Sequence, residues 1–378
     1  MYYSVFIILF AVSPAPGDST GIDERPVLPW QLSGQVLPTG SNPSRDPHYL
    51  QVVTTYEPGP GPGIYGQYVY AGLPSGFISA TFGWRSLLFG SFSYTHNIEL
   101  DFLGRHRLSI TPALFSDYQP NRLLDQVQVN ERRTGGRIHT IYNYDYTEFY
   151  DFSQLLVLKH ARVRIDPEDG APSLTDITSV ETGPAIVRMA TAGLLPADLL
   201  LEGRILVGRD HKNDVLYSRV RLGGRWHYPF EAGFAIHTEI YGEWASPNVP
   251  LFERPSFGGS LSVRGYRLDA LLGRTHLTGQ QELWIPVPGT MSAEDGIGSI
   301  LRRNLRIAAF IDAAAIGRTS ISNPDPSGIR TGAGLGLRIR TGSMTLRADW
   351  GHRLVDIGDG DFRGNFFLSI RPDLFLFF

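Results

Sequence analysis

The sequence contains no cysteine among its 378 residues, which excludes a disulfide framework, a thiolate metal site and a cysteine nucleophile. It also has no long hydrophobic run. The longest unbroken apolar segment extends from Val5 to Val12, well short of the roughly 20 residues that a membrane-spanning helix requires. Lysine and arginine form no block, and the formal net charge is −3, so nucleic-acid binding has no electrostatic support.

Glycine and aromatic residues, by contrast, are plentiful. The chain contains 42 glycines, 12% aromatic residues and only 19% charged residues. Its mean hydropathy of −0.10 lies between the values expected for a water-soluble protein and for a helical membrane protein. This intermediate value is typical of a transmembrane β-barrel, because only every second strand residue faces lipid.

The sequence divides into three parts. Residues 1–16 are a candidate signal peptide, because small residues at Ser13 and Ala15 follow the apolar core, although no basic residue precedes it. Residues 17–48 are rich in Pro, Gly, Ser and Asp without periodicity, so we expect a flexible leader. We expect residues 49–378 to form a single β-barrel.

Segments of the third part alternate between apolar and polar residues over roughly ten positions, the length that a tilted membrane-spanning strand requires. Within residues 330–340, Ala, Leu and Ile occupy one face and Gly and Arg the other. The pattern gives seventeen candidate strands, three of which are residues 104–116, 124–132 and 136–149. Because bacterial barrels have an even number of strands, we expect sixteen and infer that at least one early candidate is wrong.

The connections between these segments differ in length. Those near residues 341–342 and 228–231 are tight, whereas those at residues 246–275 and 318–329 are long. Alternation alone also fits a soluble sandwich. Tight turns at one end and long loops at the other favour a membrane barrel.

One glycine-rich stretch carries a single arginine. It runs from Phe257 to Tyr266 and reads Phe-Gly-Gly-Ser-Leu-Ser-Val-Arg-Gly-Tyr. Two predicted strands after it each carry an acid, Glu282 in Gln-Glu-Leu-Trp-Ile-Pro and Asp312 in Phe-Ile-Asp-Ala. Strand alternation places both acids on the polar face, where a planar guanidinium can engage a carboxylate through two hydrogen bonds.

These three segments resemble the barrel of the translocation and assembly porin superfamily, which includes BamA, TamA, FhaC and the bacterial surface antigens. The resemblance implies an all-β fold, a transmembrane antiparallel β-barrel of sixteen strands in the bacterial outer membrane, with a long external loop folded into the lumen. The resemblance rests on sequence motifs over residues 250–370 and only on the apolar–polar alternation over residues 49–245. Known members place periplasmic transport domains before the barrel, and here we expect none.

The resemblance also implies a latch, in which Arg264 at the loop tip pairs with acids on the barrel wall. The implied residues are the loop-tip motif Val263, Arg264, Gly265 and Tyr266, the lumenal latch acids Asp312 and Glu282, and the loop glycines Gly258 and Gly259. The sequence departs from the family pattern at Ala314, where the strand motif has glycine, and at Trp284, where many members have a basic residue.

Three functions are compatible with this reading. The first is assistance to the insertion or passage of polypeptide through a seam between the first and last strands. Its partners would be outer-membrane lipid, an unfolded outer-membrane or secreted polypeptide, and a separate periplasmic protein. The second is a gated or passive pore, whose lumen would be positive because of Arg219, Arg221, Arg225, Arg338, Arg340 and Arg347. The third is a surface antigen or scaffold with a plugged lumen.

No enzyme is expected. The sequence contains no Gly-x-Ser-x-Gly nucleophile motif, and its ten histidines form no pair at metal-ligand spacing on a shared element. We therefore assign no catalytic residue, cofactor or metal.

Overall fold

The computed structural model describes residues 48–57, 61–73, 75–85, 87–100, 106–124, 127–145, 150–168, 170–188, 198–230, 233–260, 262–267, 271–287, 305–317, 328–341, 344–355 and 364–372. The expected signal peptide and the leader up to residue 47 lie outside the described residues. The elements are β1 (His48–Glu57), β2 (Gly61–Leu73), β3 (Gly76–Arg85), β4 (Leu87–Glu99), β5 (His106–Leu124), β6 (Val127–Asp145), β7 (Tyr150–Pro167), β8 (Ser173–Arg188), β9 (Asp198–Asp210), β10 (Val215–Pro229), β11 (Ala235–Ala245), the 3-10 helix η4 (Leu251–Glu253), β12 (Ser256–Phe257), β13 (Leu271–Leu272), β14 (Thr275–Pro286), β15 (Leu305–Gly317), β16 (Ile329–Thr341), β17 (Met344–Arg353) and β18 (Gly364–Pro372).

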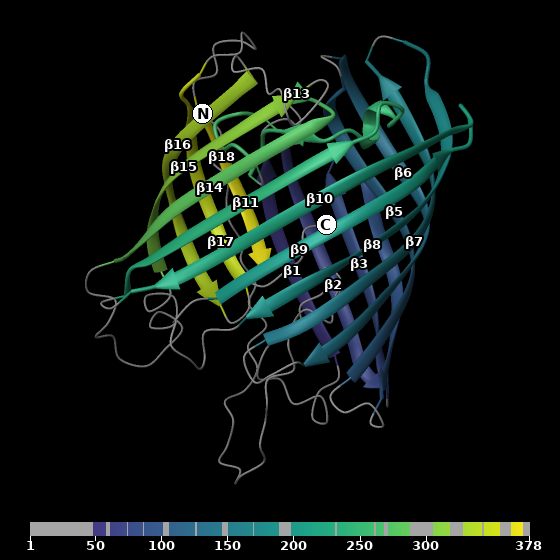
Figure 1. Ribbon diagram of the computed structural model, residues 1–378, viewed down its shortest axis with the longest axis horizontal. Helices are drawn as coiled ribbons and strands as arrows, with labels where there is room; N and C mark the ends of the chain where they lie inside the picture. Colours follow the sequence, from purple (N-terminus) through teal and green to yellow (C-terminus); the bar gives the residue numbers. More distant parts are fainter. Residues whose placement is uncertain are drawn as a thin grey trace.

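The described strands form a closed transmembrane barrel (Figure 1). Each strand pairs antiparallel with its neighbours in chain order, and β18 returns to pair with β1. Excluding β12 and β13, which form a small separate sheet, sixteen described strands make up this barrel, as the sequence predicted. In the described part of the chain, no helix is long and apolar enough to cross a membrane.

The surplus strand of the sequence prediction comes from Gly135. The residues around it suggested a break between segments 124–132 and 136–149, but the structure has one continuous strand there, β6. A Cβ at Gly135 would lie 2.1 Å from the carbonyl oxygen of His160 on β7. This glycine therefore permits close contact between two strands and does not form a turn.

The four connections named from the sequence have the expected lengths, but the separation of tight turns and long loops does not hold for the whole barrel. β14 ends at residue 286 and β15 begins at residue 305, so a long connection lies at the same end as the tight turn between β16 and β17. At the other end, two residues join β5 to β6 and one residue joins β3 to β4.

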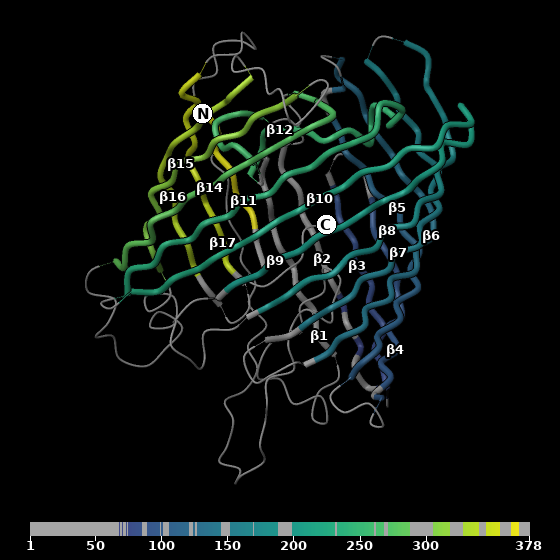
Figure 2. Tube along the Cα trace, in the orientation of Figure 1, coloured from purple at the N-terminus to yellow at the C-terminus, as the bar shows by residue number. Residues whose placement is uncertain are grey.

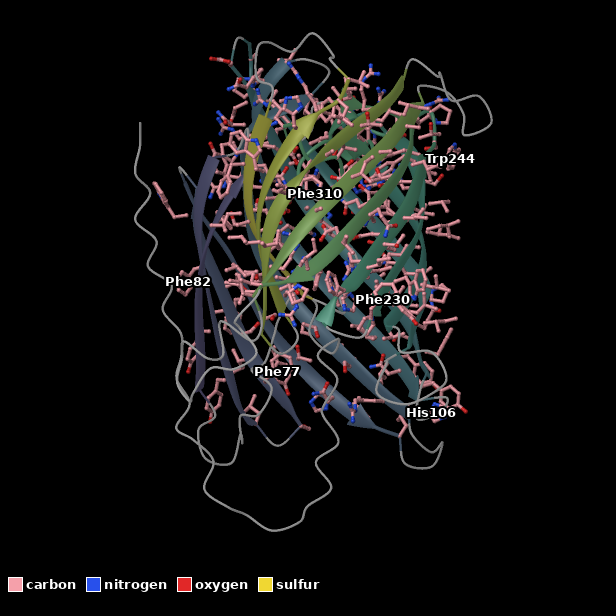
Figure 3. The ribbon with its side chains drawn as sticks, turned by 90° about the vertical axis from the view of Figure 1, so that its left-hand side faces the viewer. Phe77, Phe82, His106, Phe230, Trp244 and Phe310 are labelled. Carbon is pink, nitrogen blue, oxygen red and sulfur yellow. The ribbon has the colours of Figure 1, made fainter. Side chains whose placement is uncertain are left out.

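The two faces of the wall have opposite chemistry, as the alternation predicted. On β15, Phe310 and Asp312 are buried inside the barrel, whereas Ile311 on the outer face is 54% exposed. Phe82, seen in Figure 3, is likewise 49% exposed on the outer surface. The barrel interior is rich in buried serine, threonine, arginine and glutamate instead of a continuous apolar core.

The segment between β11 and β14 folds back into the barrel, and we call residues 246–274 the inward loop. It contains η4, β12 and β13, which Figures 1 and 2 show within the end of the barrel where β11 terminates. Phe252 of η4 packs in a cluster with residues of β5 to β8, including Phe115 and Val163. Phe257 and Tyr266 pack with Ala314 on β15. Apolar contacts on two sides of the lumen therefore hold the inward loop.

Candidate functional site

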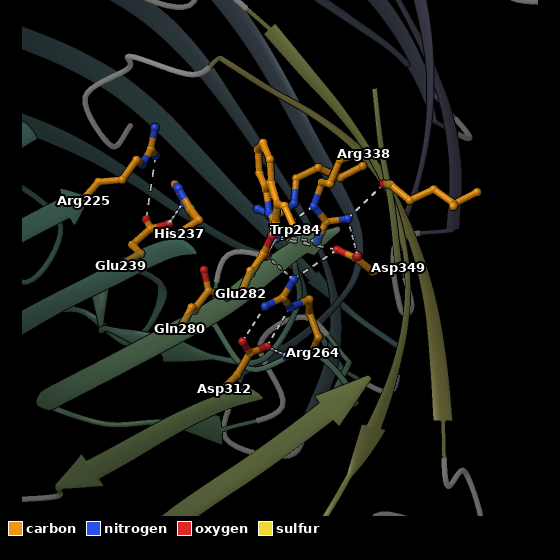
Figure 4. A network of polar contacts seen from close by, with 12 residues as sticks. Arg225, His237, Glu239, Arg264, Gln280, Glu282, Trp284, Asp312, Arg338 and Asp349 are labelled. Atoms are coloured by element: carbon orange, nitrogen blue, oxygen red, sulfur yellow. Dashed lines mark hydrogen bonds and ion pairs between the residues drawn. The ribbon is translucent and has the colours of Figure 1, made fainter. Parts of the chain in front are cut away.

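Arg264 lies at the tip of the inward loop and is fully buried. Its Nε and Nη2 donate to the two carboxylate oxygens of Asp312 at 2.7 and 2.5 Å, and its backbone N–H donates to Oδ2 at 3.0 Å. Its Nη1 donates to Glu282 Oε1 at 2.5 Å and to Asp349 Oδ2 at 3.3 Å (Figure 4). The structure thus brings the arginine together with both acids that the sequence singled out.

Two further arginines surround Glu282 and Asp349. Arg338 on β16 donates from Nε to Glu282 Oε2 at 3.0 Å and from Nη1 to Asp349 Oδ1 at 2.6 Å. Arg347 on β17 donates to Glu282 Oε1, and Trp284 donates from Nε1 to Glu282 Oε2 at 2.7 Å. We call the charged group the tip network, which consists of Arg264, Arg338, Arg347, Glu282, Asp312 and Asp349. Its three cations balance its three anions, as buried charges require.

The aromatic ring of Phe310 completes the surroundings of Arg264. The guanidinium carbon lies 3.5 Å from the ring centroid, a cation–π contact in a site from which water is largely excluded. Burial alone would lower the pKa of Arg264, but attraction to Asp312 and Glu282 outweighs burial and raises that pKa well above its ordinary value. Arg264 therefore stays charged at every physiological pH.

Glycines on β16 and β17 make room for the loop tip. A Cβ at Gly332 would lie 2.0 Å from the backbone oxygen of Arg264, and one at Gly351 would lie 2.6 Å from the backbone nitrogen of Gly265. A Cβ at Gly336 would lie 1.9 Å from a carboxylate oxygen of Asp349. Any side chain at these positions would push the loop tip or the tip network away from the wall.

The glycines of the inward loop adopt backbone conformations that other residues rarely reach. Gly258, Gly259 and Gly265 have φ values of 105°, 84° and 102°, which L side chains rarely adopt. They allow a tight reversal in which the N–H of Gly259 donates to the carbonyl oxygen of Tyr266 at 3.1 Å. The reversal places Val263 and Tyr266 in the apolar cluster with Ala314 while Arg264 faces the acids. Ala314, where the family pattern has glycine, therefore contributes to packing of the tip.

Polar contacts also connect the loop tip to the last strands. Asn365 on β18 donates from Nδ2 to the carbonyl oxygen of Gly265 at 2.7 Å. The hydroxyl of Tyr266 donates to the carbonyl oxygen of Val355 at 2.5 Å, directly after β17. The loop tip thus contacts β14 to β18 and reaches the strand that closes the barrel.

A second ionic cluster holds the start of the inward loop. Glu253 in η4 accepts hydrogen bonds from Arg133 on β6 at 2.6 Å and from Arg219 on β10 at 2.8 Å. Arg133 also donates to the carbonyl oxygen of Phe252 at 2.9 Å, and Arg219 pairs with Glu243. We call Glu253, Arg133 and Arg219 the entry anchor. The loop is therefore fixed to opposite sides of the lumen.

We expect Glu253→Gln to destabilise the folded barrel, because it leaves two partly buried arginines without this carboxylate partner. Loss of one member of a buried ion pair typically costs about 3–5 kcal/mol, and water in the lumen reduces that cost. The free energy of unfolding in urea, measured on the reconstituted barrel, checks this expectation. The control is Asp214→Asn, which removes an ion pair between Asp214 and Arg209. The Asp214 side chain is 76% exposed, so this substitution should cost less than about 1 kcal/mol. Equal effects of the two substitutions would contradict a structural role for the entry anchor.

Sequence reasoning missed Asp349 and Glu253 as partners of the loop. The sequence did contain a signal for Asp349. The tight turn between β16 and β17 places Arg338 directly opposite Arg347 on the inner face. Like charges in direct register need an acid nearby. Nothing comparable indicates Glu253, since its partners lie on strands far from it in the sequence.

The arginines that suggested a positive lumen are mostly paired with acids. Arg219 and Arg221 contact Glu243, and Arg338 and Arg347 contact Glu282. Arg225 lies 3.8 Å from Glu239 (Figure 4). The side chain of Arg340 lies outside the described residues. Pairing removes most of the expected anion preference. In the ranges described here, no group of three or more histidine or acidic side chains is arranged to hold a metal ion.

A known protein family matches the part of the chain that contains the inward loop and the tip network. Residues 204–371, which include the inward loop and the whole tip network, match the Omp85 superfamily domain. The C-terminal part of the chain therefore carries an Omp85 superfamily domain. The resemblance inferred from the loop motif and the two acids is thereby confirmed. A search of curated proteins finds no significant match.

Solved structures of two kinds of superfamily barrel share the fold. BamA from Haemophilus ducreyi, in a crystal structure lacking POTRA domains 1–3, matches with 14% identity and a TM-score of 0.62, over 86% of this chain and 70% of that chain. CdiB from Acinetobacter baumannii matches with 15% identity and a TM-score of 0.56, over 85% and 59% of the two chains. CdiB from Escherichia coli matches with 14% identity and a TM-score of 0.61, over 86% and 62%. This chain therefore spans less than two thirds of either CdiB chain.

Proposed function

We propose that this protein is an outer-membrane barrel that assists the insertion or passage of polypeptide through the seam between β1 and β18. The observation that carries the proposal is the pairing of that seam. Within the described parts of these strands, β1 and β18 pair at a single register position, Tyr56 opposite Leu368, whereas β1 and β2 pair from His48 to Glu57. A seam with so few bonds offers unpaired backbone N–H and C=O groups to an incoming strand.

The tip network would set the resting state of that seam. Asp349 on β17 and Asn365 on β18 both contact the loop tip, so the tip holds the C-terminal side of the seam from within. With the latch closed, the last strands keep their position and the lumen stays obstructed. The client would be an unfolded outer-membrane or secreted polypeptide, and a separate periplasmic protein would deliver it.

A disulfide across the seam tests the proposal. The chain has no native cysteine, so the two introduced cysteines can pair only with each other within the chain. We expect Tyr56→Cys combined with Leu368→Cys to abolish client insertion when oxidised and to restore it when reduced, because paired positions allow disulfide geometry. The measurement is the rate at which a purified outer-membrane polypeptide folds into vesicles that contain the barrel.

The matched control keeps Leu368→Cys and moves its partner to β17. Ala348 lies opposite Leu368 on the other side of β18. A disulfide between Ala348→Cys and Leu368→Cys should leave client insertion unchanged, because it closes a pair of strands that is already extensively bonded. Equal rates for the oxidised seam variant and the oxidised control would reject the proposed route.

A gated pore is the second candidate, and one feature of the lumen favours it. A cavity of about 550 Å³ lies beside the inward loop, between Phe252 and Ser262 on the loop and residues of β5 to β11 on the wall. Displacement of the loop would join this cavity to the region that the tip occupies. The lining contains both signs of charge, so such a pore would discriminate weakly between anions and cations.

A further inference from the structure

The outer face of β6 and β7 changes abruptly from apolar to basic near the end that carries the inward loop. Leu156 and Leu158 are exposed on the outer face of β7, followed at the same parity by His160, Arg162 and Arg164. A charged side chain facing lipid costs about 2–4 kcal/mol at the bilayer midplane and nearly nothing at its surface. The change therefore marks the level of the lipid headgroups.

Three arginines gather at this level. Arg164 lies directly opposite Arg132 of β6 in the strand register, and Arg162 lies one step along β7 toward the apolar band. We call Arg132, Arg162 and Arg164 the arginine triad. Like charges in direct register repel each other, and an anion placed between them would remove the repulsion.

The local acids leave much of the triad open. Arg162 and Arg164 are 61% and 56% exposed, and each uses Nε to bind an acid, Asp176 at 3.0 Å and Asp166 at 2.9 Å. Among the described residues, the terminal nitrogens of both arginines have no hydrogen-bond partner, and Arg132 has no ion pair. The triad thus presents several donors and a net positive charge to the membrane surface.

An apolar groove of about 780 Å³ lies on the same outer face, next to the triad on the side of the apolar band. Its walls include Leu114, Ile138, Leu158 and Val180, with His160 at the edge nearest the arginines. Gly136 leaves the groove hollow, because a Cβ there would approach no atom more closely than 3.7 Å. Arg162 is two positions after His160 on β7, which corresponds to about 7 Å along the strand.

We propose that the arginine triad and this groove bind one lipid with an anionic phosphate headgroup. The phosphate accepts hydrogen bonds from the terminal nitrogens of the arginines, a pairing that the planar guanidinium favours. An acyl chain of the same lipid fills the groove over Gly136. A basic head adjoining an apolar groove complements a molecule with the opposite arrangement, and a membrane lipid has it. This site lies on the outer face, away from the loop and the seam, so it is independent of the proposed function.

Native mass spectrometry of the intact barrel released from mixed micelles tests the proposal. With phosphatidylglycerol, the wild type should retain one lipid, and Arg162→Gln with Arg164→Gln should weaken that retention about tenfold. With phosphatidylcholine, whose headgroup carries no net charge, retention by the wild type should already be weak. Equal retention of both lipids by the wild type, or no loss in the double variant, would overturn the proposal.

Two further variants separate charge from shape. Asp166→Asn with Asp176→Asn increases the net positive charge and should strengthen retention of phosphatidylglycerol. Gly136→Leu fills the groove without touching a charge and should weaken retention of the same lipid. The heat-dependent gel mobility of each variant shows that the barrel is folded. If Gly136→Leu retains lipid as the wild type does, no acyl chain occupies the groove and the proposed site is wrong.

Discussion

Arg264→Ala should convert a nearly closed barrel into one that conducts steadily in planar bilayers. The substitution removes the cation that holds Asp312, Glu282 and Asp349 together, and the loop tip loses its bidentate attachment to the wall. Three acids then face two arginines in a buried network, and their repulsion favours displacement of the loop. Leaving a buried charge unpaired costs about 3–5 kcal/mol in a dry site, and water entering the lumen lowers that figure.

Two variants define what this experiment measures. Arg254→Ala removes another arginine of the same inward loop, one outside the tip network, and should leave the closed state unchanged. Arg264→Lys keeps the charge but loses the planar fork, so intermediate conductance is expected. If Arg264→Ala and the wild type are both closed, apolar packing and the entry anchor suffice to hold the plug. The gated pore would then be rejected, and the disulfide test of the seam would decide the proposed function.

Gly332→Ala should displace the loop tip almost as effectively, although it changes no charge. The new methyl group would lie 2.0 Å from the backbone oxygen of Arg264, so the tip or β16 must move. Overpacking of this kind costs about 1–3 kcal/mol, and displacement of the tip also weakens the hydrogen bonds of Arg264. We expect increased conductance together with a lower free energy of unfolding in urea.

The control for this prediction is another glycine on the barrel wall. Gly279 on β14 has nothing within 4 Å of the position that a Cβ would occupy, so Gly279→Ala should have almost no effect. The combination of Gly332→Ala with Arg264→Ala should conduct no more than Arg264→Ala alone, because both act on the same attachment. Additive increases would show that Gly332 acts elsewhere than at the loop tip.

Much of the fold could be predicted because strand alternation is a local property. The side chains of neighbouring residues point to opposite faces, so the order of residues in the segment around Asp312 is enough to place that acid inside. The Arg264 motif indicated the superfamily because its arginine and glycines are nearly contiguous and its two acids lie on the next two barrel strands. The one surplus strand arose at Gly135, where a glycine for close packing cannot be distinguished by sequence from a glycine in a turn.

The site was less predictable. Glu253 meets Arg133 only because the loop crosses the lumen, and the two residues are 120 positions apart in the sequence. Asp349 joins Arg264 across 85 positions, through the register of β16 and β17 and the path of the loop. Alternation restricts a side chain to one face but does not choose its neighbours there.

The sequence by itself therefore determined the class of fold, the inner and outer faces of the strands, and the arginine and two acids that carry the family resemblance. Tertiary structure alone decided that β6 is one continuous strand, that β1 pairs weakly with β18, that the tip network is neutral and that the loop has a second attachment. The physical reason is that alternation depends on neighbouring residues, whereas register, closure and the path of a loop depend on contacts between distant parts of the chain.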